Sequence, residues 1–149
     1  MMVLYDRLYR SVAFDIIPVK DYLPALIDEI TRNFPCGIPL RVEQKIDDFM
    51  LDTGKMQLLG IILNEILTNI IKHAFAGRDS GRINILASIE APKVRLSIQD
   101  NGIGVPETIL PSTSQGFGLK LVDMLATQLG GSIHIERDQG TRFILEFDQ

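Results

Sequence analysis

The sequence predicts an α+β protein, a two-layer sandwich in which a mixed sheet of about five strands carries about three helices on one face. Three observations lead to this fold class. Segments that alternate apolar and polar residues occur in pairs joined by short turn sequences, which is typical of hairpins. Segments with helical spacing separate those pairs. The length of 149 residues suits a single domain.

Composition narrows the classes of partner and compartment. The net charge is −4, and the 15 basic and 19 acidic residues form no long block, so nucleic acid is not an expected partner. A single cysteine allows no internal disulfide, which fits a reducing compartment. No apolar run approaches the roughly 20 residues that span a bilayer. We therefore expect a cytoplasmic protein without direct membrane contact from this segment.

Four segments have helical spacing. The segment over 2–11 is short and resembles the end of a longer helix. Residues 19–34 form an amphipathic pattern with Asp21 as the expected N-cap and Pro24 in the first turn. Residues 55–75 form the longest helical segment, and residues 119–130 end at two glycines.

The remaining segments predict strands and loops. Residues 38–46, 82–90 and 93–100 alternate, and residues 49–51 allow a short strand. A last pair of alternating segments flanks residues 138–140, a strong hairpin signal. Residues 101–118 are rich in Gly, Pro, Ser and Thr and should form a loop.

Polar side chains follow one side of the long helix. On a helical wheel, this side holds Glu65, Thr68, Asn69, Lys72 and His73. The apolar residues take the opposite side: Leu59, Leu63, Ile66, Leu67, Ile70, Ile71 and Ala74. A solvated helix face would serve as an explanation, but Asn and Thr are poor helix formers. Coordination of Mg²⁺ by a carboxamide oxygen would explain Asn69.

An acidic residue ends the strand over 93–100. Ile98 and Asp100 share a pleat face, so Asp100 should point toward the core. A carboxylate there is costly unless it binds something, such as the exocyclic amine of adenine. Gly102 and Gly104 would let backbone approach a flat ring. The sequence Asp-Asn-Gly over 100–102 also fits an ordinary turn.

Two further glycine-containing segments follow. The sequence "SQGFGLKLV" over 114–122 opens a helix, whose unpaired N–H groups can face phosphate oxygens. Gly140-Thr141 lies in the last hairpin. Each is weak evidence alone, but four such features in this order are unlikely to be coincidental.

These motifs resemble those of the ATP-binding domain of the gyrase, heat-shock chaperone, histidine kinase and mismatch-repair superfamily, which has the Bergerat-type fold. "NEILTNIIKHAF" is similar to its N box, "DNGIG" to its first glycine box, "GFGLKLV" to its second and "GTRF" to its last. The match covers residues 12–148. Within the superfamily the chain most resembles sensor histidine kinases, in a subgroup close to the HWE class. The absence of Trp separates it from the HWE class proper.

The resemblance implies a role for each matching residue. Asn69 would hold Mg²⁺, Lys72 would contact phosphate and His73 would assist. Asp100 would accept the adenine amine, and Thr141 would support it. The remaining nucleotide-binding positions implied are Gly102, Gly104, Gly116, Phe117, Gly118 and Leu119. Glu65 is the implied catalytic residue, either orienting an incoming imidazole or, as in the ATPase branches, activating water. Residues 106–115 would form a short lid.

The implied activity is that of a protein-histidine kinase that binds Mg-ATP in a two-component system. His73 and His134 are the only histidines, and neither has the surroundings of a phosphoacceptor. We therefore expect residues 1–12 to end a dimerisation helix, residues 13–149 to form the catalytic domain, and the phosphoacceptor helix to lie outside this chain. The expected partners are that dimerisation domain and a response-regulator receiver domain. The parent would be cytoplasmic or a membrane-anchored sensor with this domain in the cytoplasm. The alternatives are an ATP-hydrolysing domain of the same fold and a regulatory nucleotide-binding module.

Overall fold

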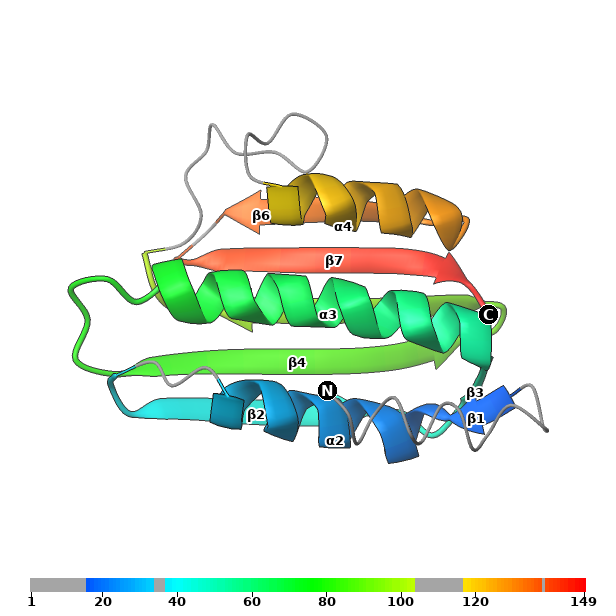
Figure 1. Cartoon of the computed structure of the whole chain (residues 1–149), viewed down its shortest axis with the longest axis horizontal. Coiled ribbons are helices and arrows are strands. Elements are labelled where there is room, and N and C mark those ends of the chain that lie inside the picture. Colours follow the sequence, from blue (N-terminus) through cyan, green and yellow to red (C-terminus); the bar gives the residue numbers. More distant parts are fainter. Residues whose placement is uncertain (1–15, 34–36, 104–116, 138) are drawn as a thin grey trace.

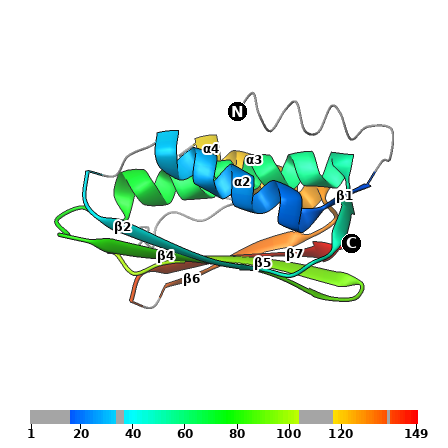
Figure 2. The same ribbon diagram turned by 90° about the horizontal axis from the view of Figure 1, so that it is seen from below.

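Three helices cover one face of a five-stranded sheet and leave the other face bare (Figure 2). The computed structural model describes residues 16–33, 37–103, 117–137 and 139–149. The layers confirm the predicted two-layer α+β fold with a mixed sheet. In chain order the elements are β1(Ile16–Pro18), α2(Val19–Asn33), β2(Leu40–Ile46), β3(Met50–Asp52), α3(Thr53–His73), β4(Gly81–Glu90), β5(Lys93–Asp100), α4(Phe117–Gln128), β6(Ser132–Arg137) and β7(Thr141–Asp148).

The main sheet has the strand order β2-β4-β5-β7-β6. Only β2 and β4 pair in parallel, since α3 connects them across the sheet, whereas the other neighbours pair antiparallel. The centre of the core crosses three strands, because Ile85 pairs with Ile98 and Ile98 with Phe143. All three side chains are buried against the helices. In Figure 1, α3 runs between α2 and α4 over this core.

The long central helix begins two residues earlier than its apolar pattern predicts. Asp52 caps it, because its side chain accepts a hydrogen bond of 2.8 Å from the Lys55 backbone N–H. The apolar arc predicted for this helix is confirmed, and every member is buried: Leu59, Leu63, Ile66, Leu67, Ile70, Ile71 and Ala74.

The helix predicted over 19–34 is confirmed in its bounds, but the N-cap predicted for it is wrong. Helix α2 begins at Val19, so Asp21 lies inside its first turn and is not the N-cap, and Pro24 lies farther inside the helix. The cause is a contact distant in sequence: the Val19 N–H donates to the Phe49 carbonyl at 2.8 Å. Strand β1, which precedes α2, pairs antiparallel with β3 in a separate two-stranded sheet. The sequence analysis did not predict β1.

Both hairpins of the sheet appear where they were predicted. Ala91 and Pro92 connect β4 to β5, and residues 138–140 connect β6 to β7. Gln139 and Gly140 both have positive φ, which accounts for the glycine in that turn. His134 is exposed on β6, as predicted. In the parts of the chain that the structure describes, no helix is both long and apolar enough to cross a bilayer. The predicted helix over 2–11 lies outside the described residues.

Candidate functional site

Asp100 is a carboxylic acid buried at the end of a central strand. Its side chain is 1% exposed and points to the helix-covered face, as the alternation of β5 predicted. One carboxylate oxygen, Oδ1, accepts a hydrogen bond of 2.9 Å from the Gly102 N–H. The other, Oδ2, is buried and has no hydrogen-bond partner among the described residues. A ligand with an N–H group could supply the donor that this oxygen lacks.

Burial changes the acidity of this group. It raises the pKa of Asp100 above its ordinary value, while hydrogen bonds from the backbone N–H groups of Gly102, Thr141 and Asp100 itself act in the opposite direction and lower the pKa. Backbone N–H groups therefore donate to the carboxyl group, while Oδ2 can still accept a further hydrogen bond. This combination suits recognition of a neutral N–H donor such as an exocyclic amine.

The strand end that carries Asp100 is joined to the end of α3. The Ile103 N–H donates to the Ala74 carbonyl at 2.7 Å, just after the helix ends. A Cβ on Gly102 would lie 1.9 Å from that same oxygen, so only glycine permits this approach. The sequence analysis predicted Gly102 for closeness to a ligand. The structure shows that the missing Cβ also lets the strand end and the helix approach each other, while the contact with a ligand stays a prediction.

The last hairpin supports Asp100 from the other side. Thr141 is 1% exposed, and its backbone N–H is one of the donors to the Asp100 carboxyl. A Cβ on Gly140 would lie 2.2 Å from the Asp100 carbonyl oxygen and 3.1 Å from its Oδ1. Sequence reasoning included Thr141 but missed Gly140 as a packing partner of Asp100. Its signal was the positive φ expected of a hairpin glycine.

The polar stripe of α3 is only partly exposed. Glu65 and Asn69 are half-buried, and Lys72 and His73 in the last turn are exposed. Asn69 lies slightly more than one turn before Ala74, the residue whose carbonyl binds the loop after Asp100. The structure thus brings the stripe and Asp100 to the same end of the molecule.

The remaining predicted positions lie at or beyond the start of α4. Phe117, Gly118 and Leu119 form the first turn of that helix, which begins two residues before the predicted start at 119. Gly104, Gly116 and the predicted lid over 106–115 lie outside the described residues. A pocket shared by Asp100 and Asn69 stays a prediction.

Two cavities are lined by described residues elsewhere. One, of about 310 Å³, opens where β2 and β4 begin. The other, of about 340 Å³, lies over the bare face of the sheet and is lined from β2, β4, β5 and β7. Neither includes Asp100 or Asn69.

Known proteins resemble the chain over most of its length. It is 29% identical over 135 residues to blue-light-activated histidine kinase 2 of Erythrobacter litoralis, covering 89% of this chain and 38% of that protein. It is 28% identical over 111 residues to the sensor histidine kinase PdtaS of Mycobacterium tuberculosis, covering 72% of this chain and 22% of the relative. The chain therefore spans well under half the length of these curated relatives.

A solved structure has the same arrangement. The histidine kinase domain of the Erythrobacter litoralis EL346 blue-light activated histidine kinase superposes with a TM-score of 0.82 at 26% identity, covering 88% of this chain and 65% of that one. The profile of the histidine kinase-, DNA gyrase B- and HSP90-like ATPases matches residues 54–149. This match takes in α3, Asp100 and the last hairpin. The chain belongs to this ATPase family, as an ATP-binding domain of the histidine kinase type.

Proposed function

We propose that the chain binds Mg-ATP and donates its γ-phosphoryl group to a histidine on a dimerisation domain outside this chain. The observation that carries the proposal is Asp100, a carboxyl group buried at a strand end, where one oxygen has no partner among the described residues. In this reading Oδ2 accepts the exocyclic amine of adenine, while backbone donors fix the carboxyl group in position. A guanine base carries a carbonyl at that position and would leave two acceptors facing each other.

The residues fit a magnesium ion that is shared with the nucleotide. Among the described residues, no three His, Cys, Asp or Glu side chains gather into a site of their own. Asn69 would supply one carboxamide oxygen and the phosphate oxygens would supply others, which is the usual way proteins hold Mg²⁺ with nucleotides. The ion would neutralise phosphate charge. Lys72 and His73, exposed one turn farther along α3, would face the phosphates.

Glu65 is assigned the role of orienting the incoming imidazole. It is half-buried and lies one turn before Asn69, so it would be close to the terminal phosphate if Asn69 holds the metal. The downstream partner in this proposal is a response-regulator receiver domain, and the setting is the cytoplasm.

Thermal-shift titration tests nucleotide binding. A ligand at 100 times its dissociation constant stabilises the native state by roughly 2.7 kcal/mol. Mg-ATP and Mg-ADP should raise the melting temperature, and GTP should do so far less. Asn69→Ala should remove the part of the shift that depends on Mg²⁺, whereas Gln57→Ala, an exposed position on the same helix, should not. The absence of a shift with any adenine nucleotide at millimolar concentration would refute the proposal.

A second experiment tests phosphotransfer. The chain is mixed with the dimerisation helices of its parent protein and radiolabelled ATP, and acid-labile, base-stable phosphohistidine is measured. Label on the helices is expected. If the chain instead hydrolyses ATP alone, and Glu65→Gln abolishes that turnover, it is a hydrolase of the same fold.

A further inference from the structure

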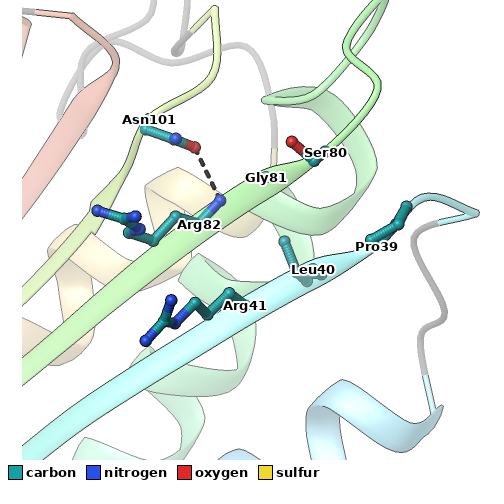
Figure 3. A pocket seen from close by; sticks show the side chains of 7 residues that line it. All are labelled: Pro39, Leu40, Arg41, Ser80, Gly81, Arg82 and Asn101. Atoms are coloured by element: carbon teal, nitrogen blue, oxygen red, sulfur yellow. Dashed lines mark hydrogen bonds between the residues drawn. The ribbon is translucent and has the colours of Figure 1, made fainter.

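The start of β2 and β4 presents two arginines side by side on the bare face of the sheet. Arg41 and Arg82 are direct register partners in the parallel pair. Both are exposed, and Figure 3 shows both side chains on the same side of the two strands. Like charges placed opposite each other destabilise a strand pair. An anion bound between the two side chains would remove this repulsion.

The cavity of about 310 Å³ at this point is rich in hydrogen-bond donors. Besides the two guanidinium groups, Ser80 lines it with a hydroxyl and Asn101 with a carboxamide. The Asn101 oxygen is already used, because it accepts the Arg82 backbone N–H at 2.8 Å, the dashed line in Figure 3. This leaves the carboxamide N–H₂ group as the part of that side chain able to bind a ligand.

Among the described residues a carboxylate pairs with Arg41 but none pairs with Arg82. Glu43 contacts Arg41 at 2.8 Å, but both side chains are well exposed, at 72% and 46%, so this ion pair is weak. Neither Glu43 nor Asp79 lines the cavity. Within the described ranges, no carboxylate lies within ion-pair distance of Arg82.

Arg95 offers a comparison on the same face of the sheet. It is exposed on β5, but its register partner is Glu146, a residue of opposite charge. Arg82 has Arg41 as its register partner on one side, and on the other it is hydrogen-bonded to Asn101, which is neutral. Arg82 and Arg95 are therefore both exposed, but the charges of their neighbours on the adjacent strands differ.

We propose that Arg41, Arg82, Ser80 and Asn101 form a binding site for a doubly charged oxyanion, a phosphate group or a dicarboxylate. Two guanidinium groups can each donate a pair of N–H bonds to such an ion. The site is separate from the predicted nucleotide pocket, because Asp100 points to the helix-covered face and Arg82 to the bare face. This inference does not depend on the proposed function.

The test is titration of the whole chain with inorganic phosphate, sulfate and glutarate at constant ionic strength, followed by backbone amide NMR. Constant ionic strength matters because salt screens surface charges. We expect the amides of Gly81, Arg82 and Asn101 to shift. Arg82→Gln should raise the dissociation constant at least about tenfold, the effect of losing a charge-assisted bond pair. Arg41→Gln should raise the dissociation constant less, because the Arg41 guanidinium already forms an ion pair with Glu43.

Arg95→Gln is the matched control, because it removes the same charge from the same face, and it should leave binding within about twofold. Equal losses in Arg82→Gln and Arg95→Gln would show general charge attraction and overturn the proposal. So would the absence of binding by all three anions, or binding that Asp100→Asn abolishes and Arg82→Gln leaves intact. The preferred anion among the three identifies whether the natural ligand is a phosphate or a carboxylate.

Discussion

The two ends of α3 differ in how their polar groups are satisfied. At its start, Asp52 caps the helix, and the Lys55 ammonium donates to the carbonyls of Asp148 and Gln149, both at 2.9 Å. The Gln149 side chain in turn donates to the Met50 carbonyl at 2.7 Å. This network ties the start of the helix to the C-terminal strand, and each group in it has a partner.

At the other end, buried polar atoms lack partners. Asp100 Oδ2 and Thr68 Oγ1 are both buried without a hydrogen bond among the described residues. Such atoms each cost about 1–3 kcal/mol when no ligand or water meets them. The difference indicates that the hydrogen bonds at the start of the helix stabilise the fold, whereas the polar atoms near its other end are available to bind a ligand. Four experiments test this comparison, beginning with the largest expected effect.

Gly102→Ala should cause the largest loss of stability, about 3 kcal/mol or more. Its Cβ would lie 1.9 Å from the Ala74 carbonyl oxygen, a backbone atom that cannot rotate away. Urea denaturation measures the change. The control is Gly77→Ala, where φ is +74° but no atom lies within 4 Å, so backbone strain alone should cost about 1 kcal/mol. Equal losses in the two variants would mean that the contact between β5 and α3 is not tight.

Asp100→Asn should reduce adenine nucleotide affinity at least about 100-fold, or about 2.7 kcal/mol. The variant places an N–H₂ group or a weaker acceptor opposite the adenine amine. Its stability without nucleotide should equal or exceed that of the unmodified chain at neutral pH, because a buried charge is removed. Calorimetric titration measures affinity. Asp48→Asn, at an exposed carboxylate, should change neither quantity.

The stability difference between Asp100→Asn and the unmodified chain should depend on pH. The folded state raises the pKa of Asp100 above its ordinary value of 3.8, so folded protein keeps the proton after unfolded protein has lost it. The unmodified chain therefore loses stability relative to the variant as pH rises above about 3.8, by up to about 1.4 kcal/mol per pH unit. The difference becomes constant once pH passes the folded pKa. Urea denaturation from pH 4 to pH 8 should show this. A difference that shrinks as pH rises would contradict it.

Asp52→Ala should have the smallest effect, a loss of about 1 kcal/mol from the missing cap. Nucleotide affinity should not change, because this end of α3 serves the fold. Asp52→Asn keeps an oxygen acceptor and should retain most of the stability. A loss of affinity in Asp52→Ala without a loss of stability would remove the distinction between the two ends.

Much of the fold was predictable because local patterns and tertiary structure agree. The alternation of residues 82–90 and 93–100 gave β4 and β5 within one residue, and the wheel of α3 gave its buried arc. Asp100 could be placed facing the core by counting along its strand. The strand β1, and the fact that Asp21 is not the cap of α2, could not be predicted, since both depend on contacts with residues 49–52, about 30 positions away.

The sequence by itself determined the fold class, the polar stripe on α3 and the inward side of Asp100, because side-chain periodicity of a helix or strand is a local property. Only the tertiary structure decided that Gly102 packs against Ala74 and that Gly140 packs against Asp100. It also decided that Arg41 lies beside Arg82. These contacts join strands and helices far apart in the chain. Their existence depends on register and on the distance between backbones, which no local pattern specifies.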